Sequence, residues 1–199
     1  MIPSLYEKFK EWSRTGSVYI ISDTHFEDSD CKLMDPNWLS PEDAVAILKK
    51  RVHKCDTLIH LGDVGNVEYL KQIKGYKVLI KGNHDVGSTK YKDVFDEVYE
   101  GPLMIGEKLL LSHEPILGID WCLNIHGHDH SGRCIDKYHL NVASNVCGYT
   151  PISLGEYIKN HGLNGIKSLH RDTIDQATER KQKRGERYCL KTKSAPKSL

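Results

Sequence analysis

Five short polar clusters in this chain combine side chains that bind metal ions or transfer protons. Residues i and i+2 of an extended segment point to the same side, so Asp23 and His25 can bind one ion together. Two of the three histidines His126, His128 and His130 can do the same, and their spacing leaves open which two. The clusters are Ser22-Asp23-Thr24-His25, Gly62-Asp63, Gly82-Asn83-His84-Asp85, Ser112-His113-Glu114 and His126-Gly127-His128-Asp129-His130. Their repetition predicts a metal site with ligands drawn from much of the chain.

The first three clusters each follow an apolar run that is typical of a buried strand. Strands are expected at 17–22, 57–61 and 76–81, with helices at 41–54 and 66–74 between them. Strand, helix and strand at this spacing indicate crossover units and parallel pairing. Because the carboxyl ends of parallel strands share one edge of a sheet, where ligands bind, we expect the clusters to converge there.

Shorter apolar runs follow one another from residue 94 without long helices between them. Such a pattern predicts antiparallel or mixed strands in a second sheet. The runs are 94–99, 102–105, 108–112, 121–126 and 138–146. Further helices are expected at 3–13 and from 153 to about 161, and residues 26–39 are expected to form a loop.

Taken in chain order, the clusters read D-x-H, G-D, G-N-H-D, S-H and G-H-x-H within residues 18–130. This series resembles the signature of the calcineurin-like metallophosphoesterase superfamily, and Leu111-Ser112-His113-Glu114-Pro115 is similar to its small bacterial or phage-associated members. The resemblance implies an α/β (α+β) fold in which two mixed β-sheets pack as a sandwich flanked by helices. It also implies an enzyme that hydrolyses phosphodiester or phosphomonoester bonds.

Seven metal ligands follow from the resemblance, divided between two ions that share one aspartate. The first ion takes Asp23, His25 and His130, the second takes Asn83, His113 and His128, and Asp63 bridges both. His126 then lies behind the ligands. Magnesium and calcium prefer oxygen ligands alone, so this mixture of nitrogen and oxygen donors favours a transition metal. We expect two divalent ions, manganese first, with iron, zinc, nickel or cobalt as alternatives.

The ligand set suggests a mechanism in which a hydroxide that bridges the two ions attacks phosphorus. Two dications, two aspartates and one hydroxide leave a formal charge of about +1, which favours a phosphate anion. His84 is no ligand but is adjacent to Asn83, so we expect it to be the general acid for the leaving oxygen. Asp85 is the expected partner that orients His84, and Arg133 is a candidate contact for substrate phosphate.

Two departures from the family pattern leave the ligands intact. Protein phosphatases of this superfamily follow G-D with x-x-D-R-G, whereas Asn66 stands here in place of the second aspartate and the arginine is missing. Relatives that begin D-T-H-F-G-H carry a further histidine where this chain has Glu27 and Asp28. A protein phosphatase is therefore disfavoured.

The chain of 199 residues is long enough for one domain, which we expect at 1–166. Residues 167–199 carry a net charge of +6 and residues 1–166 a net charge of −5, so a basic, partly disordered helix or tail is expected at the C-terminus. No apolar run approaches the roughly 20 residues that span a bilayer. The N-terminal residues lack the order of a signal peptide, so a cytoplasmic protein is expected.

Two alternatives to a general phosphoesterase remain open from the residues. A nuclease uses the same chemistry, and the basic tail could bring DNA or RNA to it through its charge. A binding protein with a silent metal site is the other, although such a protein usually loses ligands or the acid, and here all are present. The oligomeric state is open.

Overall fold

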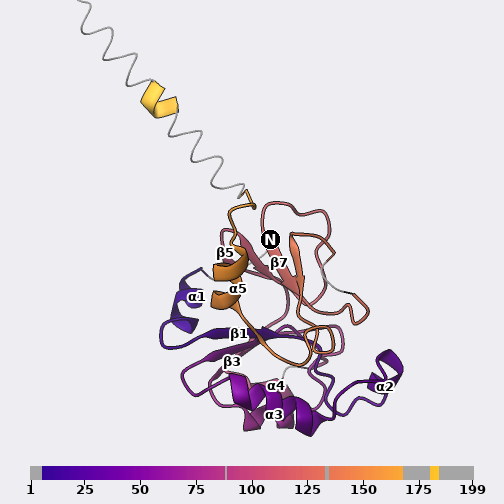
Figure 1. Cartoon of the computed structure of the whole chain (residues 1–199). Coiled ribbons are helices and arrows are strands. Elements are labelled where there is room, and N and C mark those ends of the chain that lie inside the picture. The colour runs from indigo at the N-terminus through magenta and orange to yellow at the C-terminus, as the bar shows by residue number, and fades with distance from the viewer. Residues whose placement is uncertain (1–5, 88, 133–134, 168–179, 184–199) are drawn as a thin grey trace, which may run out of the picture.

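A computed structural model describes residues 6–87, 89–132, 135–167 and 180–183. Two β-sheets form the centre of the molecule, and Figure 1 shows them as separate layers with α3 and α4 beneath the first. The first sheet has the order β4-β3-β2-β1-β9, and the second has the order β5-β6-β7-β8. The predicted sandwich of two sheets flanked by helices is thus confirmed.

Four parallel strands and one short antiparallel strand make up the first sheet. The strands are β1 (Val18–Ile21), β2 (Thr57–His60), β3 (Tyr76–Ile80), β4 (Glu97–Tyr99) and β9 (Ile152–Ser153). β9 runs antiparallel to β1 and makes this sheet mixed. The run at 94–99 was predicted for the second sheet, but β4 pairs with β3 because the connection before it is long enough to return parallel.

The second sheet begins with an antiparallel pair and continues with parallel strands. Its strands are β5 (Leu103–Gly106), β6 (Leu109–Leu111), β7 (Leu123–His126) and β8 (His139–Asn141). The segment after β8 returns to the first sheet, where Ser22 donates its N–H to the carbonyl of Val142 and accepts one from the N–H of Ser144. The two sheets are therefore joined by backbone hydrogen bonds at the end of β1.

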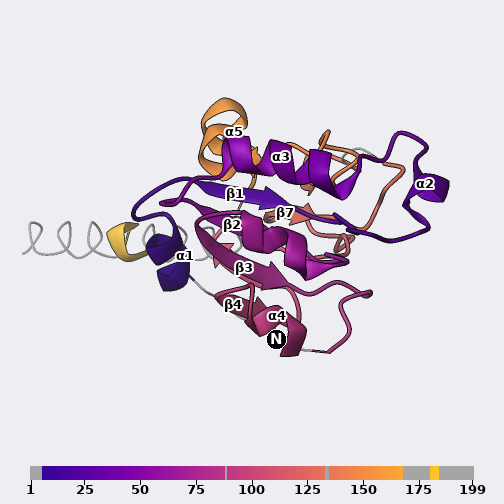
Figure 2. The same cartoon turned by 90° about the horizontal axis from the view of Figure 1, so that it is seen from below.

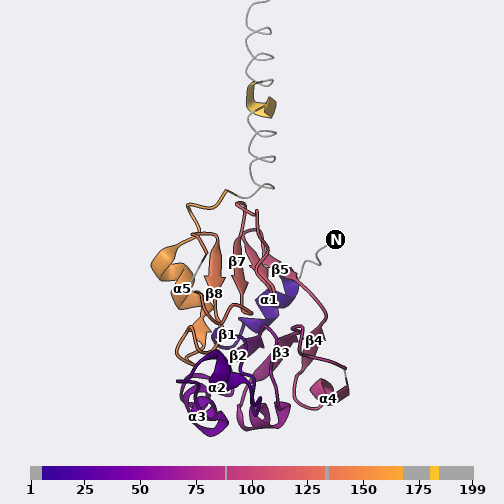
Figure 3. The ribbon, with the colours of Figure 1, turned by 90° about the vertical axis from the view of Figure 1, so that its right-hand side faces the viewer.

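Helices cover the outer face of the first sheet and the sides of the sandwich (Figures 2 and 3). They are α1 (Tyr6–Trp12), α2 (Cys31–Met34), α3 (Pro41–Arg51), the 3-10 helix η1 (Val67–Gln72), α4 (Thr89–Lys92) and α5 (Leu154–His161). The Ser40 hydroxyl caps α3 by accepting the N–H of Asp43, as the sequence indicates. The expected loop at 26–39 is interrupted by α2, which stands away from the body in Figure 2.

Alternate residues of each central strand enter two different apolar layers. Ile20, Ile59 and Val78 face the second sheet and pack with its leucines and isoleucines. Ile21, Leu58 and Leu79 of the same strands face the opposite way, into the layer with α3 and η1. Ile166 is buried in the layer between the two sheets. The predicted boundary between a domain at 1–166 and a tail at 167–199 stays a prediction, because most of the tail lies outside the described residues.

Candidate metal centre

Each of the five polar clusters begins at the carboxyl end of a strand. The clusters follow β1, β2 and β3 of the first sheet and β6 and β7 of the second. In both sheets these strands pair in parallel, so their carboxyl ends lie on one side. The backbone bonds of Ser22 to the segment after β8 hold the two sheet edges together. The site is thus built where the two sheets meet.

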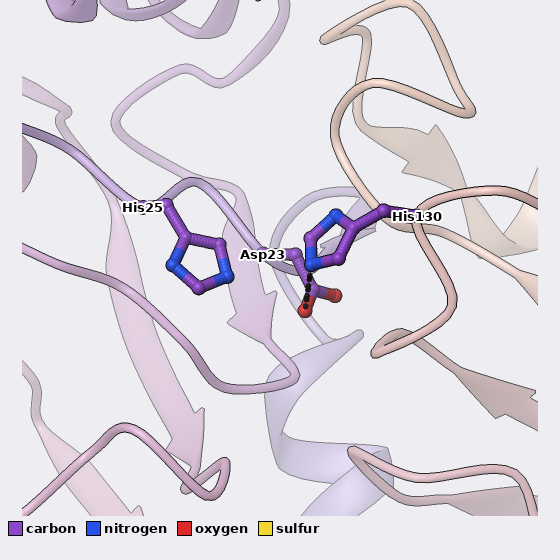
Figure 4. Close-up of side chains that lie close together, drawn as sticks. All are labelled: Asp23, His25 and His130. Atoms are coloured by element: carbon purple, nitrogen blue, oxygen red, sulfur yellow. Dashed lines mark ion pairs between the residues drawn. The ribbon is translucent and has the colours of Figure 1, made fainter. Parts of the chain in front are cut away.

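The first group of candidate ligands consists of Asp23, His25 and His130 (Figure 4). One ligand atom of each lies within 4.8 Å of the others. His130 Nε2 is 3.6 Å from Asp23 Oδ1, the pair joined by the dashed line in Figure 4. These are the three residues that the resemblance assigns to the first ion.

The second group consists of Asp63, His113 and His128, whose ligand atoms also lie within 4.8 Å of one another. His113 Nε2 lies at the centre, 3.3 Å from Asp63 Oδ2 and 3.2 Å from His128 Nδ1. Asn83 adds a fourth donor, since its Oδ1 is 2.8 Å from His113 Nε2. The members again correspond to those that the resemblance assigns to the second ion.

Asp63 connects the two groups through a single oxygen. Its Oδ2 is 3.6 Å from His25 Nε2 on one side and 3.3 Å from His113 Nε2 on the other. Burial acts to raise the pKa of Asp63, but the hydrogen bond from His113 and its positive charge outweigh this and lower the pKa to about 2. Asp63 is therefore a carboxylate over the whole physiological range and lies where an ion on either side can share it.

Buried polar atoms in the first group lack partners within the described part of the chain. Asp23 Oδ1 and His25 Nε2 are both buried and form no hydrogen bond there. Burial also raises the pKa of Asp23, since nothing compensates a negative charge at that position in full. A cation between these atoms would satisfy both. The residues present therefore fit a metal ion, and their nitrogen and oxygen donors fit a transition metal.

The backbone is strained at four of the candidate ligands. Asp23, His25, Asp63 and His128 have φ angles of 56°, 40°, 55° and 67°, in the left-handed region that side chains other than glycine rarely adopt. Each such residue costs of order 1–3 kcal/mol, and strain of this kind persists where the surrounding structure imposes it. Four of the six non-glycine residues with positive φ in the described chain are candidate ligands. This concentration indicates that the loop conformations serve to position the ligands.

Close packing around the two aspartates explains two glycines of the motifs. A Cβ on Gly82 would overlap the carboxylate of Asp63, and a Cβ on Gly127 would overlap Asp23 and Ser22. The backbone N–H groups of His84 and His128 donate to these carboxylates at 2.9 Å each. Both aspartates are thus held in place before any ion arrives.

Three of the four candidate histidine ligands are oriented through Nδ1. His113 Nδ1 lies 2.8 Å from the carbonyl oxygen of Leu61, and His130 Nδ1 lies 3.4 Å from Asn145 Oδ1. His25 Nδ1 lies 3.1 Å from Asp28 Oδ2. Neither Asn145 nor Asp28 was identified as part of the site from the sequence, because a partner behind a ligand has no fixed spacing from it.

His84 is exposed and lies beside the first group, with its ring centroid 5.4 Å from that of His25 and the two rings nearly perpendicular. The predicted role of Asp85 as the partner of His84 is wrong. Its carboxylate is buried and accepts hydrogen bonds from the backbone N–H groups of Asp63, Val64 and Gly82 and from the Tyr91 hydroxyl. Asp85 thus holds the Gly62-Asp63 loop against the Gly82–Asp85 loop. Arg133, the candidate contact for substrate phosphate, lies outside the described residues, so that role stays a prediction.

His126, the last residue of β7, is fully buried behind the ligands. Its Nδ1 lies 2.8 Å from the carbonyl oxygen of Gly127, and its ring centroid is 5.9 Å from that of His139. Neither group of ligand atoms includes it. The structure therefore places His130 in the first group of ligands and His128 in the second. The spacing of the three histidines alone could equally have made His126 and His128 the ligands.

The calcineurin-like phosphoesterase superfamily domain matches residues 17–153 of this chain. The chain belongs to that superfamily, and this membership and the two groups of candidate ligands support a metal-dependent phosphoesterase. Among curated proteins, the uncharacterized protein MJ1445 of Methanocaldococcus jannaschii is 29% identical over 167 residues, which cover 71% of this chain and 89% of the relative.

A solved structure is similar as well. The crystal structure of the protein of unknown function AQ665 from Aquifex aeolicus matches with a TM-score of 0.62 and 28% sequence identity. The match covers 72% of this chain and 98% of the other. Among the described residues, no helix has the length and apolar character needed to cross a membrane.

Proposed function

We propose that this chain is a metal-dependent phosphoric ester hydrolase that binds two divalent transition-metal ions and cleaves phosphodiester or phosphomonoester bonds. The observation that carries the proposal is the position of Asp63 Oδ2 between His25 Nε2 and His113 Nε2, at 3.6 Å and 3.3 Å. Two groups of ligands that share one carboxylate suit a pair of ions about 3.5–4 Å apart, which is the spacing used by two-metal phosphatases and nucleases.

When bound, such ions lower the pKa of water from about 15.7 toward neutrality and neutralise charge on the phosphoryl oxygens. The protein would hold the first ion with Asp23, His25 and His130 and the second with Asn83, His113 and His128. Asp63 would keep the two positions at a constant separation because its backbone N–H, carboxylate and neighbouring loop are all hydrogen-bonded. Reacting groups held in this way lose little freedom in the transition state.

His84 is our candidate for the general acid. Its side chain is exposed, while its backbone N–H donates to Asp63 Oδ1 at 2.9 Å, so the residue is anchored beside the shared ligand with a free ring. From there the imidazolium would give its proton to the leaving oxygen, which contributes about 10²–10⁴-fold in typical cases. Asp63 and Asn83 take part through the ions they bind.

Metal removal tests the proposal directly. Prolonged dialysis against EDTA should abolish hydrolysis of bis-nitrophenyl phosphate, and Mn²⁺ should restore it better than Mg²⁺ because four histidines disfavour Mg²⁺. Iron, zinc, nickel and cobalt belong in the same panel. Full activity in excess EDTA after dialysis would refute the two-metal assignment, and a metal-loaded protein without any hydrolytic activity would favour the silent binding protein.

The substrate class is tested with monoesters, diesters, cyclic nucleotides and single-stranded nucleic acid, with metal content measured on the same sample. A strong preference for the last would favour the nuclease. We also propose that residues 1–166 form the catalytic domain and that the protein acts in the cytoplasm. The basic segment 167–199 would then be an appendage that adds positive charge but no metal ligand.

A further inference from the structure

Asp28 occupies the far side of the His25 ring from the candidate metal position. Its Oδ2 lies 3.1 Å from His25 Nδ1, and its backbone N–H donates to the carbonyl oxygen of His25 at 3.0 Å. A neutral imidazole carries one N–H, so donating it from Nδ1 to Asp28 leaves the lone pair on Nε2. Nε2 is the buried atom that lacks a hydrogen-bond partner among the described residues and faces Asp63.

Both oxygens of the Asp28 carboxylate are used. Oδ2 meets His25, and Oδ1 accepts the backbone N–H of Asp30 at 2.9 Å. The preceding residue, Glu27, is anchored as well, because its carboxylate accepts from Asn66 Nδ2 at 2.6 Å and from the Tyr69 hydroxyl at 2.9 Å. Asn66, Glu27 and Asp28 are positions where the sequence departs from the family pattern, and the hydrogen bond from Asn66 to Glu27 links the loop before η1 to the turn that carries Asp28.

A second carboxylate–histidine pair in the chain can be compared with Asp28 and His25. Asp136 Oδ1 lies 2.8 Å from His139 Nδ1, and the two residues are again three positions apart in the sequence. There, however, Nε2 is 3.0 Å from the carbonyl oxygen of Ile116, so both ring nitrogens have partners within the protein. Of these two pairs, the one at His25 leaves a ring nitrogen without a hydrogen-bond partner among the described residues.

We propose that Asp28 is a positioning residue for the first metal position: its carboxylate fixes the His25 ring with Nδ1 protonated and Nε2 directed at the ion. This inference rests on the proposed function. Partners of this kind raise the basicity of the ligand, and their loss typically weakens metal affinity about 10–100-fold. The effect should be confined to the first position, since His113 at the second is oriented by the Leu61 carbonyl oxygen.

Co²⁺ titration of the metal-free, full-length protein tests this assignment. The fluorescence of Trp38 reports the first position, because its ring centroid lies 5.9 Å from that of His25 and 5.4 Å from that of His130, and an open-shell ion nearby quenches an indole. The Trp38→Phe protein supplies the background from the other tryptophans. Calorimetry on the same samples counts both ions.

Two substitutions of Asp28 separate its effect on the His25 ring from its effect on the turn at residues 28–30. Asp28→Ala removes both hydrogen bonds, whereas Asp28→Asn has one acceptor oxygen, which can keep the bond to the Asp30 N–H. The amide NH₂ group then faces His25 Nδ1 and favours the tautomer that blocks Nε2. Both variants should bind the first Co²⁺ about 10–100-fold more weakly and the second unchanged. Asp136→Asn, the matched control, should bind both ions like the wild type.

The outcomes are distinct. An Asp28→Asn protein that binds two ions with wild-type affinity would overturn this inference alone and leave Asp28 a residue of the turn. A wild-type protein that binds no Co²⁺ at either position would overturn the proposed function and this inference with it. Circular dichroism of each variant identifies any loss of fold, and the second ion provides an internal check that the site is intact.

Discussion

Gly82 packs against Asp63 so closely that a Cβ on Gly82 would overlap Oδ1 of that aspartate and stand 2.8 Å from its backbone nitrogen. The two residues belong to different loops, after β2 and β3, so the shared ligand is held by a neighbouring strand end as well as by its own. Substitution here tests whether the position of Asp63 controls the site.

Gly82→Ala should displace Asp63 and lower metal content and activity while the fold persists. Extra atoms in packed regions typically cost 1–3 kcal/mol of stability. We expect a fall of about tenfold or more in kcat for bis-nitrophenyl phosphate, equivalent to about 1.4 kcal/mol. Gly101→Ala is the control, because nothing lies within 4 Å of a Cβ at that glycine. Wild-type metal content and rate in Gly82→Ala would show that Asp63 tolerates displacement.

Asp63→Ala removes the carboxylate that, in the described part of the chain, lies between the two groups of ligands. We expect loss of at least one ion and a fall in kcat beyond about 10³-fold, which corresponds to about 4 kcal/mol. Elemental analysis and steady-state kinetics on one preparation measure both effects. The exposed Asp93→Ala variant should behave like the wild type. Retention of two ions in Asp63→Ala would exclude a shared ligand.

His84→Ala should leave the metal content unchanged, since His84 belongs to neither group of ligand atoms. The loss of activity should depend on the leaving group. Nitrophenolate leaves without a proton and should be little affected, whereas an alkoxide should lose about 10²-fold or more. Comparison of kcat for a nitrophenyl and an alkyl ester measures this dependence, and equal losses would remove His84 from the acid role.

The buried His60 predicts how stability depends on pH. Burial lowers its pKa to about 4 from an ordinary value of 6.5, and its Nε2 is 3.0 Å from the Thr24 hydroxyl. In the unfolded chain His60 binds a proton below about pH 6.5, but in the folded chain only below about pH 4, so the unfolded state gains protons first. Stability should therefore fall as the pH falls through this window, by about 3 kcal/mol in all.

Denaturant unfolding in EDTA across the window measures this dependence. In His60→Gln the slope of unfolding free energy against pH should flatten, because glutamine keeps a polar group near Thr24 without titrating. Carboxylates distant from His60 titrate alike in both proteins and cancel in the difference, whereas Asp85 and Asp63, whose charges act on His60, contribute to it. His53→Gln, at an exposed position, should retain the wild-type slope. A His60→Gln protein with an unchanged slope would assign the acid sensitivity to other groups.

The basic segment gives a prediction about nucleic acid. Deleting residues 178–199 should leave hydrolysis of a small nitrophenyl ester unchanged, because the ligands lie upstream. If the segment recruits a polyanion, binding of single-stranded DNA should weaken and lose much of its salt dependence, since fewer counterions are released. Binding isotherms at several salt concentrations decide this, and full-length protein that binds no DNA at low salt would leave the segment without that role.

The sequence predicts the convergence of ligands well because parallel strands bring their carboxyl ends to a common edge. Asp23, Asp63 and His113 can be placed at strand ends from hydrophobic runs alone. The direction of a side chain in a loop is a different matter. Asp85 follows His84 directly, yet it turns inward to accept three backbone N–H groups, and no local pattern distinguishes that arrangement from a bond to His84.

Features that depend on distant contacts were also missed. The left-handed backbone at Asp23 and Asp63 arises from the packing of one loop against another, and nothing in the residue type requires it. β9 is two residues long and carries no periodic signal of its own. Its pairing with β1 depends on a return of the chain from the second sheet that only the assembled structure reveals.

The position of the candidate site at the junction of the two sheets would give a bound ion a mechanical role as well. Asp23 follows a strand of the first sheet, and His130 follows a strand of the second, so an ion bound by both is a removable cross-link between distant parts of the chain. A cross-link between Asp23 and His130 closes a long loop of the chain and so restricts the unfolded state. In addition, a ligand that binds only the native state stabilises that state by its binding free energy. Resistance to heat should therefore rise with metal occupancy, and a chelator should lower it as it empties the site.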